Sequence, residues 1–204
     1  LQSEIKITRY RSVKTNDKYL YQLVFNLTPF YPEGGGQIGD VGTIENKNET
    51  IEIIDTKKEN NLIIHFSENL PINLDSDFSA KVDKIKRVSS ERNHSATHLL
   101  HETLREVLGE HVEQKGSLVC PDYLRFDFTH FSKISDTEIK LIEDKVNDKI
   151  LLNFTLQEHI NLPLTKAKKM GAMMLFGEKY GDTVRAIQFE SSIELCGGTH
   201  VKST

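Results

Sequence analysis

The apolar residues among the first 83 positions form short runs in which they alternate with polar residues. This period of two is typical of half-buried β-strands. Residues 49–56, for example, place Ile51 and Ile53 on one face, and the polar turn of residues 57–61 indicates a hairpin with the run that follows. The predicted strands cover residues 18–25, 49–56, 62–66 and 78–82. Several short strands separated by turn signals predict a small β-barrel-like subdomain over residues 1–83.

The hydrophobic pattern changes to helical spacing near Lys84 and keeps it to Leu108, after which Gly109 provides a stop. A second helix is predicted where Ser135 and Glu138 form a capping box ahead of an apolar run. Shorter elements are predicted as strands over residues 124–128, 154–160 and 183–189 and as a helix over residues 165–170. The pattern therefore predicts an α+β fold, with a β subdomain over residues 1–83 and an α/β subdomain over residues 84–204.

A glycine-rich segment over residues 29–42 interrupts the predicted strands. Gly34, Gly36 and Gly39 formally match the dinucleotide-binding fingerprint, but a turn and a strand follow them where that motif requires a helix. We therefore reject nucleotide binding of that kind. Two interpretations stay open, a tight turn between barrel strands and a loop whose bare backbone can approach a ligand closely.

Composition narrows the class of protein. The 204 residues are 37% hydrophobic and 27% charged, which is ordinary for a globular chain, and no apolar run reaches the roughly 20 residues of a membrane helix. The formal charge of −4 means that any nucleic-acid recognition is local and shape-driven. Two widely separated cysteines favour a reducing compartment. Because the chain lacks an initiator methionine and a secretion signal, we expect a piece of a longer protein.

Two spaced pairs of metal-binding residue types carry the candidate chemistry. His94 and His98 stand four apart in the predicted helix, so both imidazoles lie on one face, one turn apart. Cys196 and His200 also stand four apart, but around a Gly-Gly turn that folds them toward each other. Three imidazoles and a thiolate form a nitrogen and sulfur set that suits zinc. His101 is a spare ligand candidate, although a role as a core or hydrogen-bonding histidine suits it better.

Several motifs, taken together and in this order, resemble the editing domain of alanyl-tRNA synthetase and its freestanding AlaX-type relatives. They are TPFYPEGGGQIGD from Thr28 to Asp40, HSATHLLH from His94 to His101, QKGS from Gln114 to Ser117, LRFDF from Leu124 to Phe128 and LCGGTHV from Leu195 to Val201. The editing domain of threonyl-tRNA synthetase is also similar, but it has other residues at the positions of Gly197 to Thr199. The resemblance implies the second additional domain type of the threonyl and alanyl enzymes, here ending before the family's last strand.

The resemblance also implies the site residues. It gives His94, His98, Cys196 and His200 as ligands of Zn²⁺, and Thr97 and Gln114 as catalytic residues of the amino-acid pocket. Gly34, Gly35, Gly36 and Gln37 are expected to accommodate the acceptor end of tRNA. Without the resemblance, Thr97, Gln114 and the glycine turn would be interpreted as plain helix surface, loop and turn.

The activity implied is hydrolysis of Ser-tRNA(Ala) and Gly-tRNA(Ala), with the rest of the synthetase chain acting in cis in the cytoplasm, away from membranes. The intact parent would attach alanine to tRNA(Ala) using ATP, whereas this piece has no site for that reaction. Zinc can activate water or orient the substrate, and we favour orientation because four protein ligands close a tetrahedron. The alternatives are a freestanding AlaX-type trans-editing deacylase and a non-catalytic tRNA-binding module with structural zinc.

Overall fold

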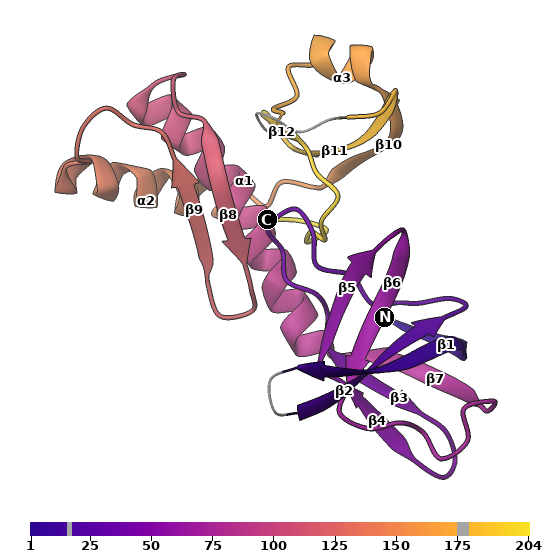
Figure 1. The fold of residues 1–204 in the computed structure, drawn as a ribbon. Helices are drawn as coiled ribbons and strands as arrows, with labels where there is room; N and C mark the ends of the chain where they lie inside the picture. The colour runs from indigo at the N-terminus through magenta and orange to yellow at the C-terminus, as the bar shows by residue number, and fades with distance from the viewer. Residues whose placement is uncertain (16–17, 175–179) are drawn as a thin grey trace. The chain divides into compact units, whose positions relative to one another are not determined.

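The computed structural model describes residues 1–15, 18–174 and 180–204 and divides the chain into two compact units (Figure 1). The first unit comprises residues 1–34 and 38–88, and the second comprises residues 35–37 and 89–204. Residues 35–37 belong to the second unit, since Gln37 forms a parallel β-bridge with Val119 and the Val119 N–H donates a hydrogen bond to Gly36 O at 2.8 Å. The predicted domain boundary between residues 83 and 84 stays a prediction.

The first unit is built on a seven-stranded antiparallel sheet with the order β4-β3-β7-β1-β2-β6-β5. Its strands are β1 (Gln2–Thr15), β2 (Lys18–Phe25), β3 (Gly42–Glu45), β4 (Thr50–Ile53), β5 (Asp55–Glu59), β6 (Leu62–Ser67) and β7 (Asp77–Val82). One apolar cluster, which includes Leu23, Ile44, Ile53 and Phe78, forms the core of this unit. The predicted hairpin is correct only in part, because β5 pairs with β6 whereas β4 pairs with β3. Residues 57–59, predicted as part of the turn, belong to strand β5.

The expectation of a small barrel is wrong in one respect, since the described strands form an open sheet with β4 and β5 at its two ends. Strand β1 belongs to both halves of the sheet. Its residues 2–6 pair with β7, its residues 7–15 pair with β2, and the register shifts between Ile7 and Arg9. The chain passes directly from β4 to β5, where the Ile54 N–H bonds to Phe66 O at 2.9 Å. The two end strands are therefore consecutive in sequence without pairing with each other.

Two buried polar groups organise the first unit around the glycine-rich segment. Asp40 accepts hydrogen bonds from the Tyr31 N–H at 2.6 Å and from the guanidinium of Arg87, and both side chains of this ion pair are buried. His65 stacks on Phe25 with ring centroids 3.8 Å apart and is fully buried. Burial lowers the pKa of His65 to about 4, so the imidazole is neutral in the folded protein near neutral pH.

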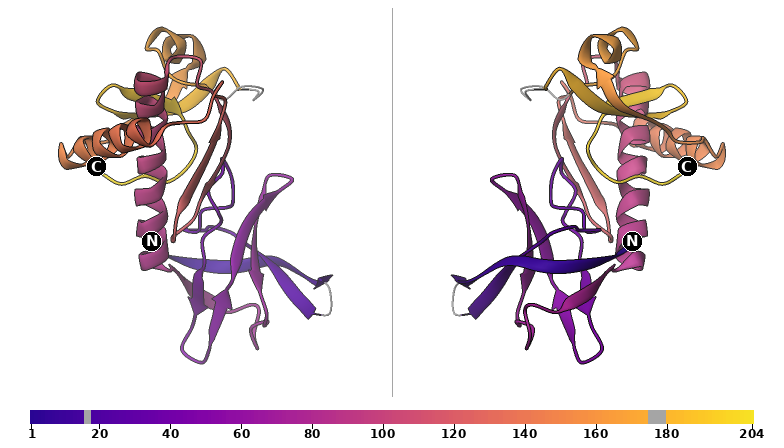
Figure 2. Two further views of the ribbon diagram at one scale, coloured as in Figure 1. Left: turned by 90° about the vertical axis from the view of Figure 1, so that its left-hand side faces the viewer. Right: turned by 90° about the vertical axis from the view of Figure 1, so that its right-hand side faces the viewer.

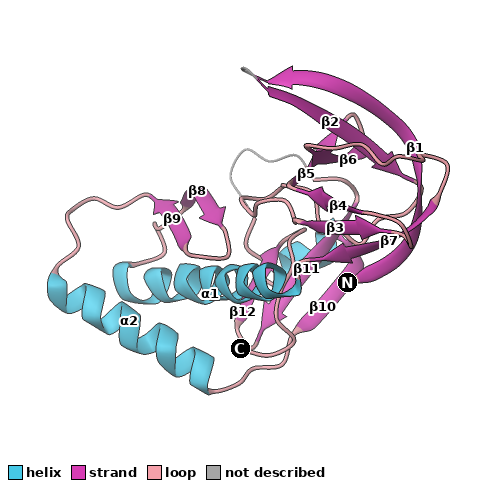
Figure 3. Ribbon diagram, turned by 90° about the horizontal axis from the view of Figure 1, so that it is seen from below, coloured by secondary structure: helices cyan, strands magenta, loops and turns pink. Residues whose placement is uncertain are grey.

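The described part of the second unit contains three helices, a β-hairpin and a three-stranded antiparallel sheet of order β10-β11-β12. Figure 2 shows the ribbon from two sides. Its elements are α1 (Lys84–Leu108, which begins in the first unit), β8 (Gln114–Val119), β9 (Leu124–Phe128), α2 (Asp136–Leu151), β10 (Gln157–Pro163), α3 (Leu164–Lys169), β11 (Thr183–Phe189) and β12 (Ser192–Leu195). Helices α1 and α2 lie side by side (Figure 3) and pack through Leu104 and Ile142.

Several elements agree closely with the sequence predictions. The helix over residues 84–108 and the strands over residues 124–128 and 183–189 have the predicted bounds. The capping box is present, with Ser135 Oγ accepting from the Glu138 N–H and Glu138 accepting from the Ser135 N–H. The strand expected over residues 154–160 begins at Gln157 instead. None of the described helices is long and apolar enough to span a membrane.

Candidate metal centre

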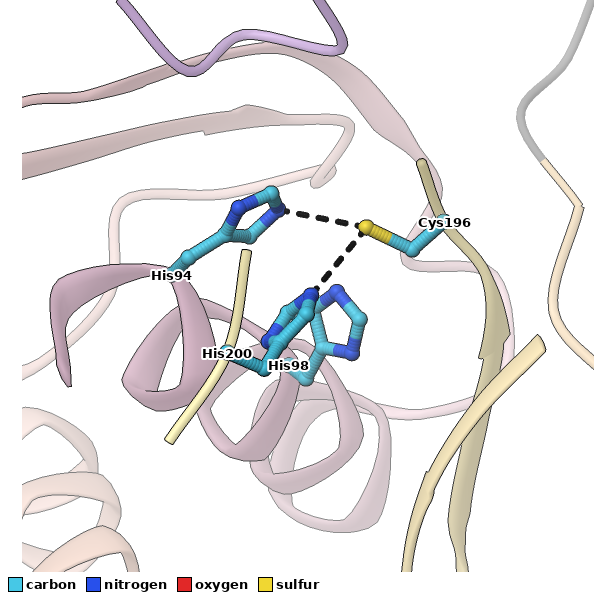
Figure 4. Close-up of side chains that lie close together, drawn as sticks. All are labelled: His94, His98, Cys196 and His200. Carbon is cyan, nitrogen blue, oxygen red and sulfur yellow. Dashed lines mark hydrogen bonds between the residues drawn. The ribbon is translucent and has the colours of Figure 1, made fainter. Parts of the chain in front are cut away.

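The two predicted metal-binding pairs converge at one place in the second unit (Figure 4). Helix α1 presents His94 and His98, Cys196 follows β12 directly, and His200 lies in the next loop. One donor atom from each of the four residues lies within 4.8 Å of the others. The convergence of residues about one hundred positions apart, which the spacing of the motifs predicted, is therefore confirmed.

The distances between the donor atoms suit a small metal ion. Cys196 Sγ lies 3.4 Å from His94 Nε2 and 3.2 Å from His200 Nε2. A tetrahedral zinc ion, with bonds of about 2.0–2.3 Å, separates its donor atoms by roughly 3.3–3.8 Å. The His98 Nδ1 atom is buried without a hydrogen-bond partner among the described residues. Geometry and donor chemistry together show that this cluster can hold a metal ion.

The Gly-Gly turn allows the cysteine and histidine to reach the helix. A methyl group on Gly198 would overlap the His94 ring and lie 3.0 Å from Gln37 Oε1, so only a hydrogen fits at this position. A methyl group on the neighbouring Gly197, by contrast, would have no other atom within 4 Å. The Arg185 guanidinium donates to the carbonyl oxygens of Cys196 and Gly198, both at 2.8 Å, and so fixes the turn from strand β11.

Hydrogen bonds around the cluster orient two of the imidazoles. His94 Nδ1 lies 2.8 Å from Gln37 Oε1, which also accepts from the Thr199 N–H at 3.0 Å. His200 Nδ1 lies 3.1 Å from Ser95 Oγ, which accepts from the Val201 N–H at 3.2 Å. Because Gln37 Oε1 can only accept, His94 carries its proton on Nδ1 and turns the lone pair of Nε2 toward Cys196 Sγ.

Burial keeps these histidines in the neutral form that binds metals. It lowers the pKa of His94 to about 3, with a further contribution from the neighbouring His98. Burial is the main cause that lowers the pKa values of His98 and His200, and nearby histidines lower them further, whereas Glu194 opposes the shift at His94 and His98. Neutral imidazole is the ligand form of histidine, so the centre needs no deprotonation of these side chains near neutral pH.

A small cavity of about 70 Å³ adjoins the cluster. Thr97 and Gln114, the two predicted catalytic residues, both line it together with His94, His98 and Cys196. Thr97 Oγ1 donates to Asn93 O one helical turn away at 2.8 Å, so its lone pairs remain available to a ligand. Gln114 begins strand β8, where the register shifts before Gly116.

The residues predicted to bind the acceptor end lie in different places. Gly35 lines the 70 Å³ cavity, whereas Gly36, at φ +81°, packs against the backbone of Ser117. Gln37 is buried, and its side chain hydrogen-bonds to His94 and Thr199, so it orients residues of the cluster. Gly34 belongs to the first unit, where its carbonyl accepts from Tyr31 Oη at 2.8 Å.

His101 is not part of the four-residue cluster, in agreement with the hydrogen-bonding role expected for it. Its Nδ1 lies 2.9 Å from Glu194 Oε1. Sequence reasoning missed Glu194, Ser95 and Arg185. The sequence shows only that a glutamate stands two positions before Cys196, and the partners of Ser95 and Arg185 are visible only in three dimensions.

Comparison with known proteins identifies the relatives of this chain. The family described as tRNA synthetases class II (A) matches residues 4–86. Alanine–tRNA ligase of Bacteroides fragilis is 61% identical over 201 residues, which is 98% of this chain and 23% of that protein. The enzymes of Flavobacterium psychrophilum and Porphyromonas gingivalis are 56% and 51% identical, over 100% of this chain and 24% and 23% of their own lengths. This chain is similar to one region of the alanine–tRNA ligases.

The resemblance to alanyl-tRNA synthetase is therefore confirmed. The chain spans about a quarter of the length of the curated relatives it matches, at 23–24% of each. The family match covers most of the first unit, whereas the candidate metal centre lies in the second unit, which the alanine–tRNA ligases match together with the first.

Proposed function

We propose that this chain is the editing domain of an alanine–tRNA ligase and that it hydrolyses Ser-tRNA(Ala) and Gly-tRNA(Ala) at a zinc-containing site. The observation that carries the proposal is the cluster of three histidines and one cysteine beside a 70 Å³ cavity lined by Thr97 and Gln114. The similarity to alanine–tRNA ligases supplies the class of substrate.

A physical need for such a site exists in any enzyme that selects alanine. Serine differs from alanine by one hydroxyl and glycine by one methyl, and such differences give only about 10- to 200-fold discrimination in a binding pocket. A second site that hydrolyses the wrong ester closes the remaining gap. The small cavity suits a small amino acid.

Thr97 has a specific role in this proposal. Its hydroxyl hydrogen is used in the bond to Asn93 O, so its free lone pairs accept a hydrogen bond from the hydroxyl of a seryl group. An alanyl group has no such donor. Gln114 lines the same cavity and has both a donor and an acceptor for the ester or for water.

The four donor residues His94, His98, Cys196 and His200 would hold zinc, and a bound zinc ion supplies Lewis-acid character and orientation. Four protein ligands complete a tetrahedron, so we assign orientation to the ion and the positioning of water to the polar groups of the cavity. Gly35, which lines the cavity, would approach the acceptor end.

The relatives support a proposal for the wider setting of the site. The parent protein would attach alanine to tRNA(Ala) with ATP, and the rest of that chain would act in cis with this domain in the cytoplasm. The three relatives described above are named as ligases, which favours a part of a synthetase over a freestanding AlaX-type deacylase.

A deacylation assay tests the proposed function. We expect the protein to accelerate hydrolysis of Ser-tRNA(Ala) and Gly-tRNA(Ala) well above that of Ala-tRNA(Ala), and Cys196→Ala to lower both zinc content and seryl-ester hydrolysis. Binding of tRNA without acceleration of serine release would instead identify a tRNA-binding module with structural zinc. Unchanged zinc content in Cys196→Ala would remove the thiolate from the ligand set.

A further inference from the structure

Glu194 is a buried acidic residue that the proposed function has not yet used. It lies in β12, where all four residues are buried, and it is 8% exposed. A carboxylate in such surroundings is costly unless other groups bind to it. The contacts of its two oxygens therefore indicate what it does.

The two carboxylate oxygens have different surroundings. Oε1 lies 2.9 Å from His101 Nδ1, which fixes the side chain against helix α1. Oε2 lies 3.6 Å from His98 Nε2, beyond hydrogen-bond distance, and has no hydrogen bond from any residue that the structure describes. One oxygen is thus anchored, while the other is available to a donor from outside the protein.

The position of Glu194 shows where that donor would come from. Glu194 lines the 70 Å³ cavity with Thr97 and Gln114, and it is the one acidic residue among the lining residues. The same set contains no lysine or arginine that could pair with this carboxylate. Glu194 therefore supplies a carboxylate acceptor inside this cavity.

We propose that Glu194 Oε2 binds the α-ammonium group of the esterified amino acid. This inference rests on the proposed function, because it places the amino acid of an aminoacyl ester in the 70 Å³ cavity. The seryl hydroxyl would face Thr97 while the ammonium group faces Glu194, so the two contacts together select a seryl ester with a free α-amino group. His101 acts as a positioning residue that holds Oε1.

The ligand class follows from this chemistry. Esters with a free, protonated amine fit the site, whereas N-acylated or deaminated esters lose the charge-assisted hydrogen bond. A hydrogen bond of this kind to a charged group corresponds to about a 10- to 100-fold preference in affinity.

Binding of two non-hydrolysable analogues tests the inference without relying on catalysis. The probes are 3′-seryl-amido-3′-deoxyadenosine and its 3-hydroxypropionyl counterpart, which lacks only the amine. We expect the zinc-loaded protein to prefer the seryl probe by about 10- to 100-fold in calorimetry. Glu194→Gln should reduce this preference below about 3-fold, and Glu194→Asp should retain part of it. Glu113→Gln is the matched control, since Glu113 lines only the adjoining cavity of about 280 Å³, whereas Glu194 lines both cavities.

The outcomes separate this inference from the proposed function. If the wild-type protein binds both probes equally or binds neither, or if Glu194→Gln keeps the full preference at unchanged zinc content, Glu194 does not bind the ammonium group. Hydrolysis of Ser-tRNA(Ala) by the wild-type protein is measured separately. Such hydrolysis without any amine preference would refute the role of Glu194 and leave the editing activity in place.

Discussion

Replacing Gly198 by alanine adds a single methyl group beside the candidate metal centre. The added carbon would overlap the His94 ring and approach Gln37 Oε1 to 3.0 Å. Non-bonded carbon atoms are comfortable at about 3.5–4.0 Å, so the ring or the turn must move by roughly 1 Å or more. Metal–ligand distances tolerate only about 0.2 Å, and a displaced His94 therefore no longer completes the set.

The expected effect of Gly198→Ala is a loss of zinc affinity of at least about 100-fold, the upper end for changes that act on a ligand through its surroundings. Overpacking also costs about 1–3 kcal/mol of folding stability. Gly197→Ala is the matched control, because a methyl group there meets nothing within 4 Å. Zinc affinity measured by competition with a chromophoric chelator, with circular dichroism to monitor folding, compares the two variants. Equal zinc affinities in both variants would refute the assignment of His94 as a ligand held by this turn.

Three further predictions concern the cavity and the first unit. Thr97→Val should remove the contact with the seryl hydroxyl and reduce the preference for seryl over alanyl esters, and unchanged relative deacylation rates would reject that contact. Arg87→Met leaves the Asp40 carboxylate buried without its cation and should cost about 3–5 kcal/mol in urea unfolding, whereas Arg125→Met at an exposed pair should change little. Burial lowers the pKa of His65 in the folded protein to about 4, so the neutral imidazole contributes about 3 kcal/mol to the free energy of unfolding above about pH 6.5, and this contribution is lost as the pH falls toward 4. The non-titrating variant His65→Gln should flatten the fall of the unfolding free energy over this pH range. Equal slopes in the two proteins would contradict the assignment.

Local patterns were sufficient for much of the second unit. The helix over residues 84–108 was predictable because apolar residues recur at helical spacing and Gly109 follows, and the strand over residues 183–189 also has its predicted bounds. Strand β1 was not predicted, since of its described side chains only Ile5 is buried and its pairing partners, β2 and β7, are set by the whole sheet. The open sheet was missed for a similar reason, because alternation marks strands and contains no information on closure.

The site divides in the same way. The four candidate ligands were predictable, since metal chemistry restricts residue types and spacing to a few patterns. Gln37 was expected at the acceptor end, yet it lies behind His94, because its buried amide finds partners only after the chain folds. Glu194 was not singled out, since nothing local shows that β12 turns this carboxylate toward the cavity.

The most direct test of the zinc-containing editing site is a crystal structure of the protein with 3′-seryl-amido-3′-deoxyadenosine, recorded at the zinc absorption edge. We predict an anomalous peak bound by His94, His98, Cys196 and His200, with the seryl group in the cavity between Thr97 and Gln114. An anomalous peak elsewhere, no peak in zinc-loaded crystals, or a seryl group bound outside this cavity would contradict the account.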